Sequence, residues 1–187
     1  MEDNFKLKTD EELIELISFN EEEAIIELLK RYEKSLFLFI RRFSFSNDES
    51  ADILQNIFIK IWKGSGKFDN KRAGAKTFIW TIARNTIYDA LRKKRLFIEN
   101  EYDNDEMLEN VTDSTNIFSS ILKKEEEENV KKLIKELNAN EQTIFSLYYG
   151  EDMTFKEIGE ILGKSVNTVK SVHLRAIKKL RTMLHQN

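Results

Sequence analysis

The stretch from Thr154 to Arg181 constrains the fold of this chain more than any other, because it predicts two helices separated by a tight turn. Thr154 and Glu157 have the spacing of a capping box, in which each side chain satisfies a backbone N–H of the other residue. Gly163 stands where the first helix should end and the backbone needs a positive φ, and Ser165 is a favourable N-cap for the second helix. An apolar stripe at helical spacing marks the buried face of the first helix: Phe155, Ile158, Ile161 and Leu162.

The second predicted helix has two distinct faces. Val169, His173, Ala176 and Leu180 share the face that should pack on the first helix. A helix-turn-helix that binds DNA needs this division, because one face of its recognition helix packs on the partner helix while the other enters the major groove. The residues that we expect to meet DNA are Asn167, Thr168, Lys170, Ser171, Leu174, Arg175 and Lys178.

The distribution of charge separates this prediction from that of an ordinary amphipathic helix pair in a bundle. From Lys164 to the C-terminus the chain has six Lys and Arg and no Asp or Glu, which suits a phosphate backbone. Residues 60–95 hold eleven Lys and Arg against two Asp, whereas residues 96–116 hold seven Asp and Glu and no basic residue. The formal net charge of −3 therefore hides local fields of both signs, and binding follows the local field.

Composition excludes several classes of protein and site. The 187 residues include no Cys, so we expect no disulfide and no Cys-ligated zinc. No apolar run is long enough to span a membrane, and the polar N-terminus has no signal-peptide core, so we predict a cytoplasmic protein without membrane insertion. Gly64-Ser-Gly-Lys67 lacks both the upstream glycine and the following hydroxyl of a phosphate-binding loop. We predict no catalytic residue, no metal ligand and no cofactor, and hence no enzyme.

The hydrophobic pattern predicts an all-α chain of two small helical domains. Helices are expected at residues 10–17, 20–43, 48–63, 76–95, 117–137 and 141–149, followed by the helix-turn-helix. Asp48 is the expected cap of the third helix, and the glycine-rich residues 64–75 are an expected loop. Residues 99–118 are acidic and poor in core-forming side chains, which predicts a flexible linker between domains at 1–98 and 119–187.

The helix expected at 48–63 offers a second candidate surface. Its buried stripe is predicted to be Leu54, Ile57, Phe58 and Ile61. The outer face carries the polar residues Asp52, Gln55, Asn56 and Lys63. From the pattern alone such a face is as often merely solvated as functional.

A third candidate surface lies where basic and aromatic residues alternate, between residues 60 and 95. Basic side chains can follow a nucleic-acid backbone while aromatic rings stack on unpaired bases. Phe78 and Trp80 are two positions apart on a predicted helix and cannot point the same way. One of them should lie nearer the surface, and we take Trp80 as the candidate stacking residue, with Phe78 the more natural core residue. The run from Arg92 to Arg95 fits either a solvated helix end or a phosphate contact.

Three motifs, taken in order, resemble the extracytoplasmic-function class of bacterial sigma factors. Asp52, Gln55 and Phe58 match the Asp-x-x-Gln-x-x-Phe pattern of the family's polymerase-binding helix, within Glu49–Trp62. Lys76–Asn85 is similar to its promoter-melting helix, and Glu141–Gly150 with the helix-turn-helix is similar to its minus-thirty-five-reading domain. The resemblance covers about residues 21–96 and 123–183.

This resemblance implies an alternative sigma factor that binds core RNA polymerase, directs it to promoters and helps to open the minus-ten element. It implies core-polymerase contacts at Asp52, Gln55, Asn56 and Lys63. It implies minus-ten contacts at Lys67, Lys71, Arg72, Lys76, Thr77, Trp80, Arg84 and Asn85. The minus-thirty-five contacts are then the exposed residues of the recognition helix given above. An anti-sigma factor is the further implied partner, with the free protein monomeric, and either nucleoid-associated in the holoenzyme or held at the membrane by that partner.

Some positions depart from the family pattern, and one alternative function remains. The family usually has Trp where this chain has Phe78, often has Arg where it has Val172, and usually has Pro where it has Asn138. The alternative is a helix-turn-helix repressor or activator that works without being a polymerase subunit. Such a regulator binds its DNA alone, whereas a sigma factor should bind its promoter well only with core polymerase.

Overall fold

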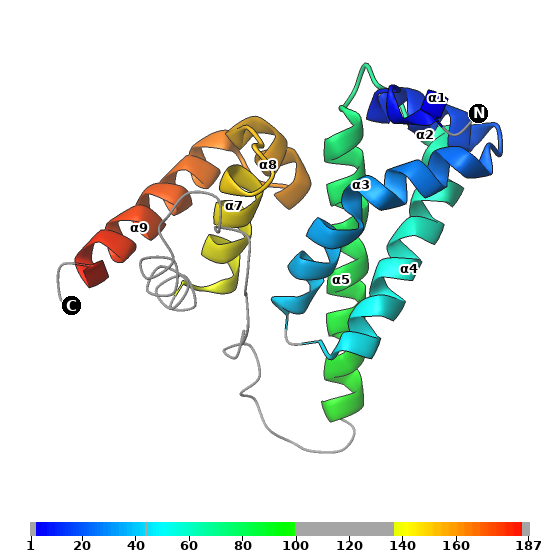
Figure 1. The fold of residues 1–187 in the computed structure, drawn as a ribbon. Helices are drawn as coiled ribbons and strands as arrows, with labels where there is room; N and C mark the ends of the chain where they lie inside the picture. The colour runs from blue at the N-terminus through cyan, green and yellow to red at the C-terminus, as the bar shows by residue number, and fades with distance from the viewer. Residues whose placement is uncertain (1–2, 44, 100–136, 185–187) are drawn as a thin grey trace. The chain divides into compact units, whose positions relative to one another are not determined.

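The computed structural model describes residues 3–43, 45–99 and 137–184, and within these ranges every regular element is a helix (Figure 1). The described helices form two compact units, one built from α1 to α5 and the other from α7 to α9. The predicted all-α fold is confirmed. The predicted linker and the helix expected at residues 117–137 lie almost entirely outside the described residues.

The N-terminal unit is a bundle in which α4 packs on α5 and α3 runs obliquely to them (Figure 1). Its elements are α1 Asp3–Lys6, α2 Asp10–Ser18, α3 Glu22–Arg41, α4 Asn47–Gly64, the 3₁₀ turn η1 Ser65–Lys67 and α5 Ala75–Glu99. Two ion pairs join α4 to α5, Lys94 to Glu49 at 3.1 Å and Lys60 to Asp89 at 3.4 Å. Beneath them lies an apolar core to which all four longer helices contribute: Leu13, Ile17, Leu28, Leu36, Phe39, Ile57, Ile61, Ile79 and Ile87.

The C-terminal unit consists of α7 Ala139–Tyr149, α8 Phe155–Leu162 and α9 Val166–Leu184. Helix α9 packs on both of the shorter helices. Leu137 and Phe145 meet Ala176 and Leu180 of α9 in a buried cluster, which fixes the face of α9 that cannot reach a partner.

Local capping explains where four of these helices begin. Capping boxes start α2 with Thr9 and Glu12, α7 with Asn138 and Glu141, and α8 with Thr154 and Glu157. A fourth box starts α4, where Ser46 and Glu49 exchange bonds.

Two local expectations need correction. The predicted cap of α4, Asp48, is wrong, because Ser46 offers both its hydroxyl and a partner Glu three residues on and so starts the helix two residues earlier. Helix α1 was not predicted, since four residues carry too little periodicity to be recognised. Among the described helices, none combines the length and apolar character that a membrane span needs.

Candidate nucleic-acid interface

The turn between α8 and α9 has the geometry that its sequence predicts. The Thr154 hydroxyl accepts from the Glu157 N–H at 3.3 Å, and the Glu157 carboxylate accepts from the Thr154 N–H at 2.8 Å. Gly163 closes α8 with a φ of 62°, in the left-handed region. The Ser165 hydroxyl accepts from the Thr168 N–H at 3.1 Å and so caps α9. The predicted capping pair, positive φ and second cap are all confirmed.

Gly159 is a feature of this turn that sequence reasoning missed. A Cβ at this buried position would lie 2.8 Å from the backbone carbonyl oxygen of Lys164, closer than folded proteins tolerate. The Gly159 carbonyl also accepts from the Lys164 N–H at 2.9 Å. The missing side chain therefore lets the turn fold back against α8 and sets the angle at which α9 leaves.

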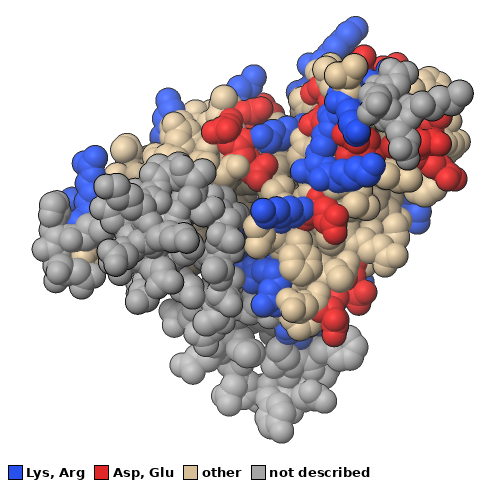
Figure 2. All heavy atoms as spheres, viewed as in Figure 1, with Lys and Arg blue, Asp and Glu red and all other residues tan. Residues whose placement is uncertain are grey.

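Helix α9 divides into the two predicted faces. Val169, Ala176 and Leu180 are buried and His173 is half-buried. Every residue that we expected to meet DNA is exposed: Asn167, Thr168, Lys170, Ser171, Leu174, Arg175 and Lys178. Leu174 is 66% exposed and adds an apolar side chain to this face. Figure 2 shows Lys and Arg at the left edge of this unit, whereas both signs mix over the N-terminal unit.

Hydrogen bonds along the exposed face of α9 hold two of its polar side chains. The Ser171 hydroxyl donates to the Asn167 carbonyl at 2.8 Å, and Arg175 Nε donates to the Ser171 carbonyl at 3.4 Å. The Arg175 side chain is thus laid along the helix, and its two Nη groups donate to no other described residue. A guanidinium held in this way presents a planar pair of donors outward, which is the shape that recognises a guanine edge.

An aromatic cluster supports α9 from behind. His173 Nε2 lies 3.2 Å from the Tyr149 hydroxyl. The rings of Phe145, Tyr148 and Phe155 lie 6.0, 5.0 and 5.1 Å from the His173 ring. Burial in this cluster lowers the pKa of His173 below its ordinary value. His173 is therefore a packing residue, as its position on the helix predicts.

The outer face of α4 is exposed at every position that we predicted, namely Asp52, Gln55, Asn56 and Lys63. Two apolar residues share this exposed side and were missed by the sequence reasoning, Ile59 at 39% and Trp62 at 44% exposed. Asp52, Gln55, Ile59 and Trp62 follow the helical spacing of three and four, so they form one continuous stripe. The helical spacing could have predicted this stripe. It was overlooked because Ile and Trp are residue types that usually belong to a core.

A basic loop, residues 68–74, joins η1 to α5. Lys67 at its start and Lys71 and Arg72 within it are exposed, and none of the three makes an ion pair with a described residue. The Asp69 carboxylate accepts from the Lys71 N–H at 3.0 Å, and the Asp69 carbonyl accepts from the Arg72 N–H at 2.9 Å. These bonds give the loop a defined shape and turn the cationic side chains outward.

Gly64-Ser-Gly-Lys67, which precedes the loop, belongs to the end of α4 and to η1. The Ser65 hydroxyl donates to the Trp62 carbonyl.

The structure corrects the prediction for Trp80. Its side chain is 2% exposed, and its ring meets Phe39 of α3 edge-on at 5.0 Å between centroids. Trp80 is therefore a core residue and cannot offer a stacking face. Phe78 is the half-buried member of the pair and lies 5.2 Å from the Phe68 ring. Thr77 is buried too, so neither Thr77 nor Trp80 is placed to touch DNA.

Tyr88 offers an exposed aromatic ring on α5, at 42% exposed. Arg84 lies over this ring with Cζ 4.9 Å from the centroid, and Arg84 Nη1 donates to the side chain of Asn85 at 3.3 Å. Lys76 is half-buried at the start of the helix. Arg84, Asn85 and Tyr88 thus form a polar and aromatic group on the surface of α5. The sequence had instead predicted Trp80 as the aromatic residue of this surface.

Two residues of the basic run at the end of α5 make contacts within the unit, and the choice between a solvated helix end and a phosphate contact stays a prediction. Lys94 pairs with Glu49 and lies over the Phe45 ring at 5.2 Å, so it serves the packing of α4 on α5. Arg92 pairs with Asp89 at 3.2 Å yet remains largely exposed.

Comparison with known families matches both units, each to a different model. Residues 28–97 match the model described as Sigma-70 region 2, and residues 133–182 match that described as Sigma-70, region 4.

Curated relatives match along almost the whole chain. The ECF RNA polymerase sigma factor SigW of Bacillus subtilis is 26% identical over 177 residues, covering 91% of this chain and 94% of that protein. The ECF RNA polymerase sigma factor RpoE of Cereibacter sphaeroides is 23% identical over 164 residues, covering 86% of each.

Solved structures share the fold. CnrH, solved in complex with the cytosolic domain of CnrY, matches with a TM-score of 0.66 at 20% identity, covering 95% of this chain and 98% of that one. The sigma factor RpoE of Bartonella quintana, solved in complex with the anti-sigma factor NepR, matches with a TM-score of 0.62 at 21% identity, covering 85% of this chain and 95% of that one.

Proposed function

Because the chain belongs to the extracytoplasmic-function class of bacterial sigma factors, we propose that its three exposed surfaces divide the work of such a factor among themselves. The protein is an alternative sigma factor that directs RNA polymerase to promoters. The observation that carries this function is that the Sigma-70 region 2 and region 4 families match the two units in order, with the predicted outer face of α4 and the predicted DNA face of α9 exposed.

The outer face of α4 is the proposed docking surface for core RNA polymerase. Asp52 and Gln55 supply polar contacts, and Ile59 and Trp62 supply apolar area beside them. A mixed stripe of this kind fits a protein partner, because interface cores favour aromatic residues within a polar rim. Asn56 and Lys63 lie at its margin.

The basic loop and the exposed side of α5 are the proposed contact surface for the minus-ten element. Lys67, Lys71 and Arg72 suit the backbone of a separated strand, and Lys76 stands where the loop joins the helix. Opening a duplex costs a few kcal/mol, which contacts to exposed bases offset. Tyr88, ordered by Arg84 beside Asn85, replaces Trp80 as the proposed stacking residue.

The exposed face of α9 is the proposed reader of the minus-thirty-five duplex. Arg175 is assigned to a base edge, and Lys178 and Lys179 to phosphates, since they lie a turn further along the helix. Leu174 can meet a thymine methyl group, which is the apolar feature of the major groove.

An anti-sigma factor is a further proposed partner. Two structural neighbours were solved with protein partners, the RpoE–NepR pair and the CnrH–CnrY pair. The protein itself makes and breaks no bond and needs no cofactor, since polymerase performs the chemistry, and we place it in the cytoplasm with its DNA.

Run-off transcription with reconstituted core polymerase tests this function. We expect transcripts only when both core and this protein are present, and a promoter gel shift that depends on core. A helix-turn-helix repressor or activator would instead shift the same DNA alone, and that result would overturn the assignment.

The docking surface has its own test. Changing Asp52 and Gln55 together to Ala should weaken co-purification with core polymerase while leaving the thermal unfolding of the chain unchanged, because neither side chain is buried. The matched control changes Glu33 and Lys34 to Ala, on the exposed side of α3. Undiminished co-purification of the Asp52 and Gln55 variant would reject this face as the docking surface.

A further inference from the structure

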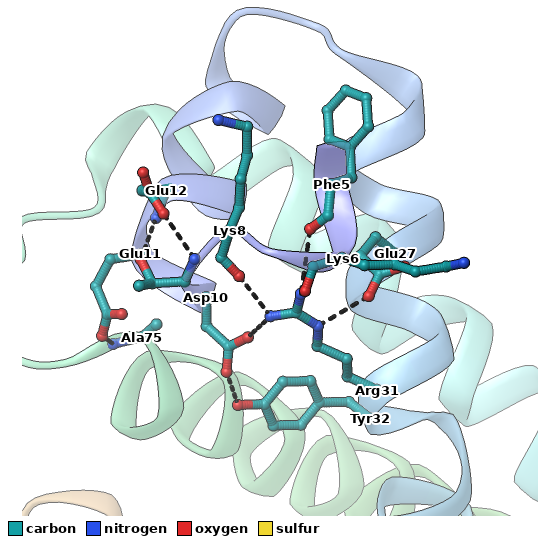
Figure 3. Close-up of polar contacts among 11 residues, drawn as sticks. Phe5, Lys6, Lys8, Asp10, Glu11, Glu12, Glu27, Arg31, Tyr32 and Ala75 are labelled. Carbon is teal, nitrogen blue, oxygen red and sulfur yellow. Dashed lines mark hydrogen bonds and ion pairs between the residues drawn. The ribbon is translucent and has the colours of Figure 1, made fainter. Parts of the chain in front are cut away.

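The N-terminal segment from Phe5 to Ser18 lies outside the residues that match Sigma-70 region 2, which begin at residue 28. It is nevertheless tied to the rest of its unit by an unusually dense set of polar contacts (Figure 3). Leu13, Ile14 and Ile17 of α2 are buried in the same core as α3 and α4. The segment is therefore an integral part of the N-terminal unit, and its role needs an explanation that the family match does not supply.

Arg31 of α3 fixes this segment in place. Its guanidinium donates to three backbone carbonyls, of Phe5 at 3.2 Å, Lys6 at 3.1 Å and Lys8 at 2.9 Å. It also donates to Asp10 at 2.7 Å and to Glu27 at 3.0 Å (Figure 3).

Asp10, at the start of α2, has a second partner. One of its carboxylate oxygens accepts from Arg31 and the other from the hydroxyl of Tyr32. Because each group is bonded on several sides, α2 has a single defined position on α3.

Glu11, the next residue of α2, reaches a different element. Its Oε1 accepts from the backbone N–H of Ala75 at 2.9 Å, across 64 positions of the sequence. Ala75 is buried and is the first residue of α5, and the Gly74 carbonyl accepts from the Phe78 N–H, which makes Gly74 the N-cap. Glycine has no side chain to cap a helix, so Glu11 provides from α2 the acceptor that α5 lacks locally. A carboxylate there also faces the positive end of the helix.

Helix α2 thus holds both ends of the basic loop. It packs against η1, which leads into residues 68–74, and through Glu11 it holds Ala75, which leads out. The loop between these two anchors carries Lys71 and Arg72, both exposed. The shape that the loop presents to DNA therefore depends on α2 as well as on the sequence of the loop.

We propose that Glu11 is a positioning residue for promoter opening: its bond to Ala75 sets the register of the basic loop against the minus-ten strand, so that selectivity at this element depends on a helix that never touches DNA. This proposal rests on the proposed function, in which the loop meets that strand. Glu11 is expected to change discrimination among promoters more than the amount of holoenzyme formed, because the α4 surface lies elsewhere in the unit.

The test compares full-length variants as holoenzymes with core polymerase, on a promoter panel that varies only the minus-ten element. Glu11→Ala removes the cap, and Glu15→Ala is the matched control, since it removes the same charge from an exposed position of the same helix. Open complexes are scored by permanganate reactivity at equal holoenzyme concentration. We expect Glu11→Ala to lower the ratio of preferred to substituted promoters about fivefold, if the energy of the lost helix-end bond, ~1 kcal/mol, acts on the preferred promoter alone, and Glu15→Ala to leave it unchanged.

A second variant restores the cap locally. Gly74→Ser in the Glu11→Ala background places a hydroxyl at the N-cap, where a Cβ added to Gly74 would have only Glu11 Oε1 within 4 Å. The new hydroxyl can accept from the N–H of Lys76 or Thr77, so it should restore the start of α5, but it should not restore the discrimination, because the loop still lacks its bond to α2. Glu11→Gln keeps an acceptor oxygen without the charge and should lose about twofold, which provides the readout if Glu11→Ala does not fold.

The outcomes distinguish the positioning role of Glu11 from the proposal on which it rests, that the basic loop contacts the minus-ten strand. If Glu11→Ala matches Glu15→Ala, or if Gly74→Ser recovers the discrimination without the bond to α2, the positioning role is wrong. If changing Lys71 and Arg72 together to Ala leaves open-complex formation intact, the loop does not meet the strand and the proposed minus-ten surface fails, whatever Glu11 does.

Discussion

The two units of this sigma factor present positive charge to DNA in different ways. In the C-terminal unit the contact surface is one face of a helix, and the bonds that start and orient that helix come from residues three to five positions away, such as Ser165 to Thr168 and Gly159 to Lys164. In the N-terminal unit Asp69 shapes the basic loop locally, but the start of α5 is held by a residue far along the chain, as Glu11 holds Ala75. A surface held by local bonds should keep its shape when residues far away in the sequence are substituted. A surface held by distant bonds should lose its shape.

The largest expected effect tests whether the N-terminal surface depends on its distant core. Trp80→Ala should lower the free energy of unfolding of the N-terminal unit by about 3–5 kcal/mol, the cost of emptying a buried aromatic site. Trp80→Phe should cost far less, because it keeps a ring against Phe39 and removes an indole N–H that has no partner in the described structure. Both tryptophans of the chain lie in this unit, so Trp62 fluorescence during urea unfolding reports it in either variant.

The same pair of variants also checks the reassigned stacking residue. Folded Trp80→Phe should bind a minus-ten single strand, as holoenzyme, as well as the original protein does. Tyr88→Ala should weaken that binding by about 1–3 kcal/mol if a base stacks on the exposed ring. Loss of strand binding in Trp80→Phe without loss of stability would restore Trp80 to the site.

This contrast also explains which features the sequence could predict. The capping box at Thr154, the positive φ at Gly163 and the two faces of α9 follow from spacings of three or four residues, and all are confirmed. The burial of Trp80 depends on Phe39, and the cap of α5 depends on Glu11, and no local spacing records either contact. The exposure of Ile59 and Trp62 was missed for a related reason. An apolar residue on an exposed stripe cannot be distinguished from a core residue by its type alone.

The next effect in size concerns local geometry in the C-terminal unit. Gly159→Ala places a methyl group 2.8 Å from the Lys164 carbonyl oxygen, and such overpacking costs about 1–3 kcal/mol. Hydrogen exchange should show faster opening of α8 and α9, and binding to the minus-thirty-five duplex should weaken. Tryptophan-detected unfolding of the other unit should not change.

Gly66→Ala is the control for that substitution, because no atom lies within 4 Å of the added Cβ and no positive φ is required there. It should leave α8 and α9 unaffected. If Gly159→Ala instead destabilised both units equally, the view that the C-terminal surface is locally specified would be wrong.

A third comparison sharpens the division of labour on α9. Arg175→Ala should cost about 1–3 kcal/mol at promoters with the preferred base and relax preference at one position, as expected for a base-edge contact. Lys178→Ala should weaken all promoters alike and lower the salt slope by about one. Transcription from a minus-thirty-five mutant panel at several salt concentrations measures both. An equal loss at every promoter for Arg175→Ala would make it a backbone contact.

The smallest expected effect is a difference in how the two units respond to acid. Burial lowers the pKa of His173 below its ordinary value of 6.5, so the folded C-terminal unit favours the neutral ring. Its contribution to stability is complete above pH 6.5 and is lost as the pH falls from there towards the lower folded pKa, because the unfolded chain binds the proton more readily.

The N-terminal unit should respond in a lower range of pH. A bond from the Ser46 N–H, together with Lys94, lowers the pKa of Glu49, and a bond from the Thr9 N–H lowers that of Glu12. These carboxylates add stability that is complete above their ordinary pKa of 4.5 and is lost as the pH falls through the lower folded values.

Between about pH 7 and pH 5 the C-terminal unit should therefore lose stability while the N-terminal unit keeps its stability. Hydrogen exchange in α8 and α9, set against tryptophan-detected unfolding, separates the two. His173→Phe should abolish the change in this range. A change that survives in His173→Phe would mean that another group titrates, and that the aromatic cluster behind α9 is not the acid-sensitive part of the unit.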